Sequence, residues 1–216
     1  YKEQPIIILM DEIISPDEKL NGLDEPSESF PANVTIIVVV NPRRSYKLPT
    51  LPESVLQINL TTPYRSTIAI TSLARFLAKS IGVDVPEGEF GSDVEGKKPI
   101  AFDVGANKEK LKIALQRSRE QLGDDATFLY DGWLPSLMKE ICESHGKEKE
   151  GPWECYKAVN FFGWEAERVV AVTTGLRILE MATRAKRELI LILAEPEKEE
   201  YKEDYQDIQV MIKAAE

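Results

Sequence analysis

The segment ERVVAVTTGLRILEMATRAKRELILILAE, residues 167–195, decides the fold class. It begins and ends with apolar runs, 167–175 and 188–195, which are typical of strands buried on both faces. Between them, residues 176–186 have the apolar spacing of a helix. A strand, a helix and a second strand in this order are typical of a parallel sheet covered by helices.

The same alternation extends along most of the chain. Gly82 and Gly123 end two of the helical patterns, as glycine commonly does. We predict further strands at 6–10, 34–40, 55–60, 99–105, 126–132 and 154–163, and further helices at 66–82, 107–123 and 134–146. The sequence therefore predicts an α/β fold with a mainly parallel sheet flanked by helices.

Composition and charge narrow the function. The 216 residues carry a net charge of -10, which disfavours broad, non-specific nucleic-acid binding. Half of that charge lies in residues 195–216, which contain eight acids and three lysines. No apolar run is long enough to span a bilayer, and no secretory signal is present, so we expect no membrane partner and an intracellular protein, cytoplasmic or nuclear. Tyr1 is not a natural start, so we expect the chain to be part of a longer protein.

Cysteine usage agrees with an intracellular location. Two cysteines, Cys142 and Cys155, are too few for a disulfide framework and are better interpreted as reduced, partly buried thiols. Together with His145 they offer three metal ligands. Their spacing fits no zinc module and a fourth ligand is missing, so zinc is disfavoured.

Polar groups that follow apolar runs are the candidates for a site, because ligands in open parallel sheets bind beyond the carboxyl ends of the strands. These groups include carboxylates, which suit Mg²⁺ and the activation of water, and arginines, which offset the charge of a γ-phosphate. They are Asp11-Glu12, Asn41-Pro42-Arg43-Arg44, Tyr64-Arg65-Ser66, Gly163-Trp164-Glu165 and Thr183-Arg184-Ala185. The combination predicts a magnesium-nucleotide site.

In this order the segments resemble motifs II to VI of the UvrD/Rep-like superfamily 1 helicases; helicase-like relatives of the Schlafen type fit equally well. IIILMDE resembles motif II, which implies that Asp11 binds Mg²⁺ and Glu12 activates water. VVVNPRRS resembles motif III, where Arg44 takes the place of the glutamine that senses the γ-phosphate.

The remaining motifs lie further along the chain. LTTPYRST resembles motif IV, with Tyr64 at the nucleotide and Arg65 near the γ-phosphate. VNFFGWEAERVVAV resembles motif V, which implies that Glu165 holds the ribose hydroxyl. LRILEMATRAKRELIL, the closest match, resembles motif VI and makes Arg184 the equivalent of an arginine finger.

The resemblance implies a RecA-like P-loop NTPase fold whose first domain is incomplete. Residues 1–60 would be the C-terminal remnant of a first RecA-like domain, 61–195 the second domain and 196–216 an acidic tail. The implied cofactors are ATP and Mg²⁺ in the intact protein. The implied partners are single-stranded nucleic acid, bound weakly by so acidic a chain, and a missing N-terminal domain or partner protein.

Several departures from the family pattern limit this function. The 216 residues contain no G-x-x-x-x-G-K-[ST] loop to cradle phosphates. Asn41, Phe162 and Trp164 replace an aspartate, a lysine and a leucine of the family motifs. We therefore predict that this chain alone hydrolyses ATP poorly or not at all. The main alternative is a degenerate, helicase-derived pseudo-ATPase that acts as a protein-interaction module.

Simpler interpretations exist for the same residues. Glu165 could pair with Arg168, and Arg184 could complement the dipole of its helix, a role that Lys186 or Arg187 would serve equally. Exposed lysines and tryptophans are more often solvated faces and packing residues than nucleic-acid contacts, and residues 196–216 are most simply a solubilising segment. A receiver- or flavodoxin-like domain is a third possibility, which would place Asp11 and Asp103 in one acidic cluster.

Overall fold

The computed structural model describes residues 6–13, 34–40, 65–80, 92–145, 155–161, 164–175 and 177–215. The chain divides into two compact units. The first comprises residues 1–60 with 81–83, and the second comprises residues 61–80 with 84–216. Each unit is described by itself. Asp11 and Asp103 fall in different units, so the acidic cluster expected for a receiver-like domain stays a prediction.

The first unit contains two parallel strands, β1 (Ile6–Ile13) and β2 (Val34–Val40). The predicted strand at 34–40 is confirmed. The prediction that the first strand ends before Asp11 is wrong: pairing shifts register after Met10 and resumes at Ile13, so Asp11 and Glu12 lie within β1. Arg44, Tyr64 and the predicted strand at 55–60 lie outside the described residues.

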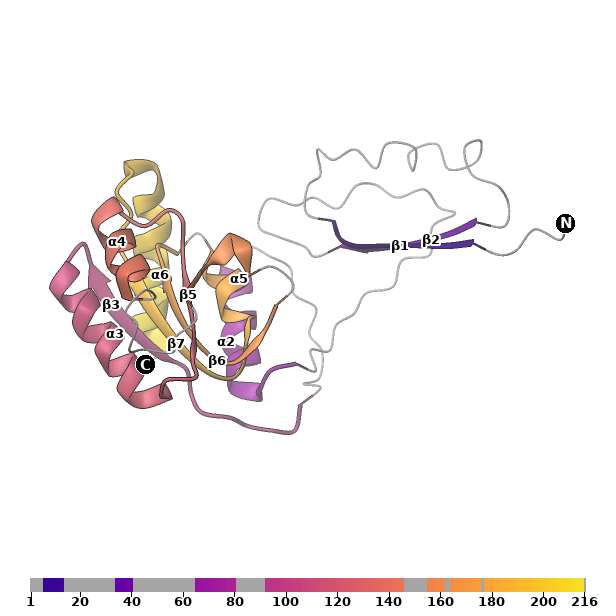
Figure 1. The fold of residues 1–216 in the computed structure, drawn as a ribbon, viewed down its shortest axis with the longest axis horizontal. Helices are drawn as coiled ribbons and strands as arrows, with labels where there is room; N and C mark the ends of the chain where they lie inside the picture. Colours follow the sequence, from indigo (N-terminus) through magenta and orange to yellow (C-terminus); the bar gives the residue numbers. More distant parts are fainter. Residues whose placement is uncertain are drawn as a thin grey trace, which may run out of the picture. The chain divides into compact units, whose positions relative to one another are not determined.

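The second unit is built on a five-stranded sheet in which every pairing is parallel, with the order β3-β7-β6-β4-β5. The α/β prediction is therefore confirmed (Figure 1). The strands are β3 (Ile100–Gly105), β4 (Thr127–Tyr130), β5 (Cys155–Lys157), β6 (Ala166–Thr173) and β7 (Ala185–Ala194). The helices are α2 (Ile68–Ser80), α3 (Lys108–Leu122), α4 (Ser136–His145), α5 (Ile178–Ala182) and α6 (Lys202–Ala215), with short 3-10 turns η1 (Ala158–Asn160) and η2 (Glu199–Tyr201).

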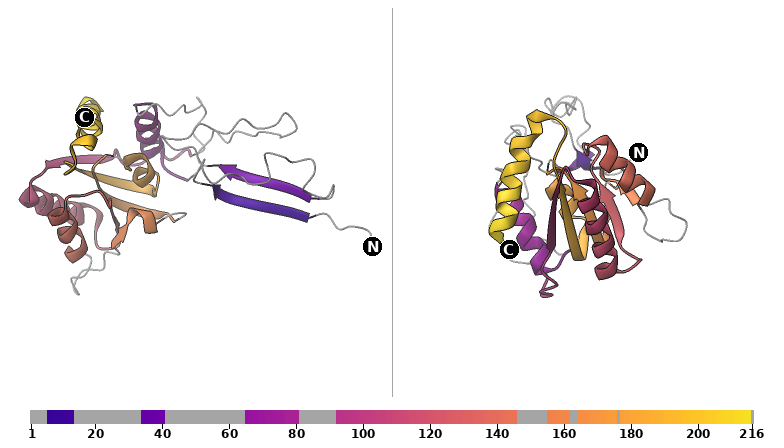
Figure 2. Two further views of the ribbon diagram at one scale, coloured as in Figure 1. Left: turned by 90° about the horizontal axis from the view of Figure 1, so that it is seen from above. Right: turned by 90° about the vertical axis from the view of Figure 1, so that its left-hand side faces the viewer.

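Alternate side chains of the central strands pack into two cores on opposite faces of this sheet. Val170 and Ile190 belong to the core shared with α3 and α4. Their neighbours Val169 and Leu191 belong to the core shared with α2, α5 and α6. Figure 2 shows α3 and α4 on one side of the sheet and α2 and α6 on the other. Burial on both faces explains why β6 and β7 are nearly continuous apolar runs.

Two of the elements that are shorter than predicted lie next to the candidate site residues Glu165 and Arg184. The helix expected at 176–186 is α5, only Ile178–Ala182, because Ala185 already pairs with Ala166 in the sheet. The strand expected at 154–163 is only Cys155–Lys157 and continues into η1. In both places sheet pairing sets the limits of the element, and local apolar spacing does not show where that pairing begins or ends.

The acidic C-terminal segment forms a helix that packs on the sheet. Tyr205 and Ile208 of α6 are buried, and the Tyr205 hydroxyl donates a 2.8 Å hydrogen bond to Asp103 Oδ1 at the end of β3. The interpretation of residues 196–216 as a solubilising segment is therefore wrong, because α6 completes one of the two cores. In the described part of the chain, no helix is long and apolar enough to cross a membrane.

Candidate functional site

Three segments that are distant in sequence lie side by side in the second unit. The middle segment, 184–186, is bonded on one side to 65–67, through Ser66 Oγ to the Ala185 carbonyl at 2.7 Å and Thr67 N to the Lys186 carbonyl at 3.0 Å. On its other side the Ala166 amide donates to the Arg184 carbonyl at 3.0 Å. The structure thus brings together the segments that resemble motifs IV, V and VI.

This site lies at the amino ends of the strands, not at the carboxyl ends. Glu165 directly precedes β6 and Arg184 directly precedes β7. The prediction that both residues follow apolar strands is wrong, because η1 lies between β5 and Glu165, and α5 lies between β6 and Arg184. Asp11 and Glu12, which belong to the other unit, are not placed relative to this site.

Glu165 is the anionic centre of this site. Its Oε1 lies 2.5 Å from Arg65 Nη1 and its Oε2 lies 3.5 Å from Lys186 Nζ. The Glu165 side chain is only 17% exposed, whereas that of Arg65 is 69% exposed. The interpretation that Glu165 pairs with Arg168 is wrong, because Arg168 pairs with Asp125 and Glu188 instead.

Arg184 is a buried cation, 7% exposed. Its guanidinium donates to two backbone carbonyls, Glu180 O at 3.3 Å and Trp164 O at 3.4 Å. Within the described ranges no carboxylate forms an ion pair with it. A buried charge that lacks a counter-ion is destabilising.

The helix-dipole interpretation explains part of this geometry. The bond to Glu180 O does place a cation at the end of α5, but α5 has five residues and a correspondingly small dipole. Lys186 and Arg187 do not serve this role equally, because they pair with Glu165 and Glu167. The two hydrogen bonds of Arg184 connect α5 to the loop before β6.

Side chains, rather than the start of α2, supply the ligand-binding potential of this site. The Ile68 and Ala69 amides already donate to the carbonyls of Val94 and Glu95 at 2.9 and 3.0 Å. The adjacent Thr67 hydroxyl is buried, has no hydrogen-bond partner among the described residues, and packs against Gly96. The cationic groups Arg65, Arg184 and Lys186 outnumber the single carboxylate of Glu165. We call these four residues the cationic cluster, and it carries an excess of two positive charges.

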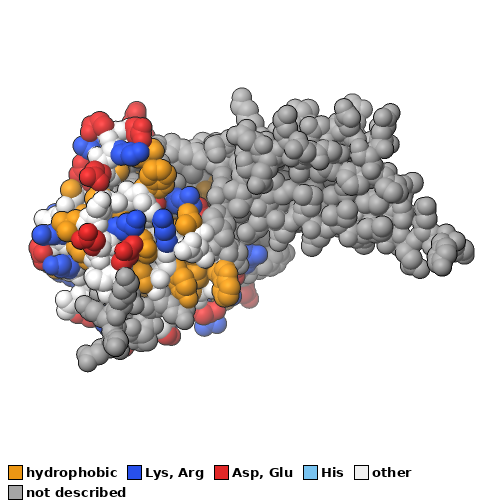
Figure 3. Space-filling view, turned by 45° about the horizontal axis from the view of Figure 1, so that its top comes forward, with side chains coloured by type: hydrophobic (Ala, Val, Ile, Leu, Met, Phe, Trp, Pro, Cys, Tyr) orange, Lys and Arg blue, Asp and Glu red, His pale blue; other side chains and the backbone are white. Residues whose placement is uncertain are grey.

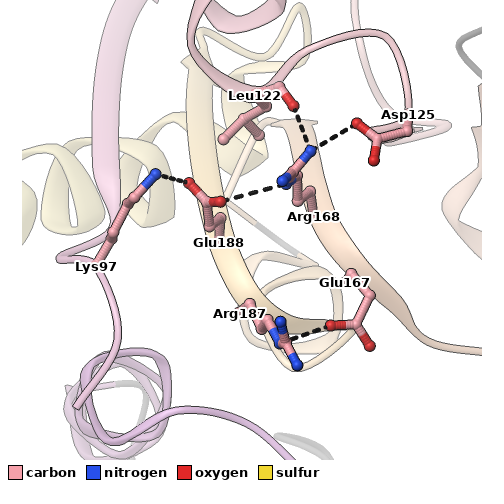
Figure 4. A network of polar contacts seen from close by, with 7 residues as sticks. All are labelled: Lys97, Leu122, Asp125, Glu167, Arg168, Arg187 and Glu188. Atoms are coloured by element: carbon pink, nitrogen blue, oxygen red, sulfur yellow. Dashed lines mark hydrogen bonds and ion pairs between the residues drawn. The ribbon is translucent and has the colours of Figure 1, made fainter. Parts of the chain in front are cut away.

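A second set of charges near the amino ends of β6 and β7 is balanced (Figure 4). Arg168 donates to the Leu122 carbonyl at 3.1 Å and to Asp125 Oδ1 at 2.7 Å, and its Nε lies 3.2 Å from Glu188 Oε1. Lys97 pairs with the other oxygen of Glu188 at 2.7 Å. We call Lys97, Asp125, Arg168 and Glu188 the balanced network. It ties the end of α3 to two strands and the 92–99 segment.

The carboxyl edge of the sheet contains a buried aspartate that the sequence analysis missed. Asp131 is fully buried and accepts hydrogen bonds from the Trp133 amide and the Thr174 hydroxyl, each at 3.1 Å. Asp131 and Thr174 directly follow the apolar strands β4 and β6, so the rule applied to other strand ends would have found them. These bonds hold the turn after β4 to the end of β6.

A polar cavity of about 310 Å³ lies at the same edge, between β3, β7 and α6. Lys110 and Lys202 are opposed there by Asp103 and Glu195, so its charges are balanced. Both Asp103 oxygens already accept hydrogen bonds, from Tyr205 and from Gln209. The cavity therefore lacks the charge excess of the cationic cluster.

Both cysteines are free thiols whose pKa is raised by burial. Cys142 is fully buried, and burial raises the pKa of its thiol well above the ordinary value. Burial also raises the pKa of Cys155 to about 12. No group of three metal-binding side chains occurs within the described residues.

The described surface visible in Figure 3 is mixed in charge. On the face shown in Figure 3, basic, acidic and hydrophobic side chains are interspersed. Trp164, next to the cationic cluster, is 69% exposed. Trp133 packs edge-on against Tyr201 with 5.4 Å between ring centroids, and Lys198 lies over both rings. Trp153 lies outside the described residues.

Comparison with known proteins adds no family assignment. No family model matches the chain, and no curated protein matches it significantly.

Proposed function

We propose that this chain is the C-terminal portion of a superfamily 1 helicase-like ATPase. In the intact protein, ATP and Mg²⁺ would lie between two RecA-like domains. Arg65 and Arg184 of the second domain would neutralise charge on the γ-phosphate, while Asp11 and Glu12 of the first would hold Mg²⁺ and activate water. Hydrolysis would be coupled to translocation along, or remodelling of, a single-stranded nucleic acid.

The convergence of residues 65–67, 164–166 and 184–186 is the observation that supports this proposal. The three segments match successive motifs by sequence alone, and Ser66 and Ala185 are 119 positions apart in the chain. Their contact gives a cluster with excess positive charge and a buried arginine that has no carboxylate partner among the described residues. Such a cluster suits an anion with several negative charges.

The first unit supports the idea that more polypeptide completes the nucleotide site. In the described part of the chain, β1 and β2 pair only with each other. Parallel sheets are normally larger and covered by helices on both faces. We infer that further strands and helices complete this sheet, and that the phosphate-binding loop is supplied with them.

The second candidate function, a pseudo-ATPase that acts as an interaction module, also has an observation in its favour. Glu165, expected at the ribose, already pairs with Arg65, expected at the γ-phosphate. Together with Asn41, Arg44 and Phe162, this pairing is what a site that no longer turns over would show.

Nucleotide binding by the purified chain tests the proposal. We expect weak binding, with a Kd of roughly 1 mM, because only the second domain's half of the site is complete. MgATP should bind more tightly than MgADP, and Arg184→Met should remove that difference. Equal affinity for the two nucleotides, or no effect of Arg184→Met, would favour the interaction module.

Hydrolysis gives a separate test. We expect no magnesium-dependent ATP turnover by this chain alone. Turnover that is abolished by Glu12→Gln would contradict this expectation and would assign catalysis to the residues that are present.

A further inference from the structure

We propose that Glu165 is an internal counter-ion that a polyphosphate ligand must displace, rather than a ligand for the ribose. In this role Glu165 pairs with Arg65 and Lys186 while the site is empty and selects for ligands that carry several negative charges. The inference rests on the proposed function, because it concerns the same site.

Both carboxylate oxygens of Glu165 are occupied by cations. Oε1 is paired with Arg65 at 2.5 Å and Oε2 with Lys186 at 3.5 Å. At 17% exposure the carboxylate is held close to the protein, whereas the Arg65 side chain is 69% exposed and free to turn outward. A ribose hydroxyl would therefore compete with two charged donors for the same oxygens, and charge-assisted bonds are the stronger ones.

Lys186 thereby becomes part of the site. Lys186 is absent from the site that the sequence predicts, yet its Nζ lies 3.5 Å from the carboxylate that also pairs with Arg65. Arg184 and Lys186 lie in one segment, on either side of Ala185, and Arg65 lies in the segment that is hydrogen-bonded to it. When Glu165 is displaced, all three cations become available to one polyanion.

The charges explain the expected selectivity. A monoanion that displaces Glu165 replaces one carboxylate by one charge and gains little. A polyphosphate has enough oxygens to contact Arg184 as well, which has no carboxylate partner among the described residues. The cationic cluster should therefore bind triphosphates more tightly than monophosphates or carboxylates.

A second ion pair, close to Glu165 and Lys186 in the sequence, offers a matched control for the charge change. Glu167 of β6 pairs with Arg187 of β7 at 2.9 Å, but both side chains are well exposed, at 59% and 76%. Replacement of Glu167 removes the same charge only two residues further along the chain, without freeing a member of the cationic cluster. The comparison of Glu165→Gln with Glu167→Gln therefore separates displacement of the counter-ion from a change in net charge.

The experiment measures the Kd of inorganic tripolyphosphate and of MgATP for the wild type and for these two variants by calorimetry. We expect Glu165→Gln to tighten tripolyphosphate binding about fivefold, because release of one ion pair near the surface is worth up to about that factor. Glu167→Gln should change it less than about twofold. The gain should shrink at high ionic strength, because salt screens the pair.

Glu165→Asp keeps the charge on a shorter side chain and should not tighten binding. It also serves where Glu165→Gln perturbs the fold, which circular dichroism would reveal. Tightening by Glu165→Asp as large as that by Glu165→Gln would overturn the counter-ion role.

The remaining outcomes distinguish the two proposals. If Glu165→Gln weakens MgATP binding but not tripolyphosphate binding, Glu165 contacts the nucleoside; this overturns the counter-ion role and leaves the proposed function standing. If Glu165→Gln changes neither affinity while the wild type binds MgATP, only the counter-ion role fails. If no variant binds either compound, both proposals fail.

Discussion

Two groups of charged side chains lie near the amino ends of β6 and β7, and they differ in one respect. The balanced network sets Arg168 and Lys97 against Glu188 and Asp125. The cationic cluster sets Arg65, Lys186 and Arg184 against Glu165 alone. The positive and negative charges of the balanced network are equal in number. The cationic cluster retains an excess of two positive charges in a chain whose net charge is -10.

This difference separates a structural role from a binding role. Every member of the balanced network has a partner of opposite charge, and Arg168 also bonds the last turn of α3. No ligand is needed to explain it. In the cationic cluster Arg184 is buried and, among the described residues, its hydrogen bonds go to carbonyl groups without a carboxylate partner, an arrangement that does not stabilise a fold by itself.

The largest predicted effect concerns the balanced network. Arg168→Met should lower the free energy of unfolding by about 2 kcal/mol, because it removes hydrogen bonds to two carboxylates and to the Leu122 carbonyl. The partly buried carboxylate of Glu188 would then keep only one of its two cationic partners in the balanced network, Lys97. Urea denaturation measures this change. Binding of MgATP should be unaffected; a loss of binding without a loss of stability would place Arg168 in the site instead.

Arg184→Met should have the opposite pattern. We expect the free energy of unfolding to stay the same or to rise, because a buried cation without a carboxylate partner among the described residues is replaced by an apolar side chain. Affinity for MgATP should fall about tenfold or more. The same urea and binding measurements apply, and a marked loss of stability with unchanged binding would make Arg184 a structural residue.

Alkaline pH should lower the stability of the fold through Cys155, and neither the balanced network nor the cationic cluster should change this effect. Burial raises the pKa of Cys155 to about 12 in the folded protein, so its contribution to stability is complete below about pH 9 and is lost as pH rises toward 12. At pH 10 this loss should be on the order of 1 kcal/mol, discounted for partial exposure, and Cys155→Ala should reduce it. Arg168→Met and Glu165→Gln should leave the slope of stability against pH unchanged; a changed slope in either would mean that the charge groups titrate with the core.

The smallest predicted change in the free energy of unfolding concerns an exposed ion pair and serves as the reference for Arg168→Met. Arg187→Met removes an exposed ion pair on the same strands and should change the free energy of unfolding by less than about 0.5 kcal/mol. If Arg187→Met lowered the free energy of unfolding as much as Arg168→Met, the loss would depend on the location of the arginine at the amino ends of the strands. It would not depend on how many partners the arginine has.

The sequence predicted the sheet better than the site. Apolar runs such as 34–40 and the segment around Val169 mark buried strands directly, because burial on both faces leaves no polar alternation. The limits of α5 and β5 escaped prediction because pairing with neighbouring strands sets them. That error moved Glu165 and Arg184 to the wrong edge of the sheet. Asp131 was missed although it directly follows an apolar strand.

The partners of each charge could not be predicted. Arg168 lies three residues after Glu165 in sequence, and proximity favoured that pair. Cross-strand register instead places Arg168 beside Glu188, and the 65–67 segment brings Arg65 to Glu165. Contacts between residues a hundred positions apart depend on the fold and are absent from local patterns.

Amide chemical-shift mapping of the isotope-labelled chain during titration with MgATP tests the central claim most directly. If nucleotide binds at the cationic cluster, the largest shifts should occur at residues 65–67, 164–166 and 184–186. Residues Lys97, Asp125, Arg168 and Glu188 should shift little. Shifts centred on the balanced network, or on the polar cavity beside Asp103, would contradict it.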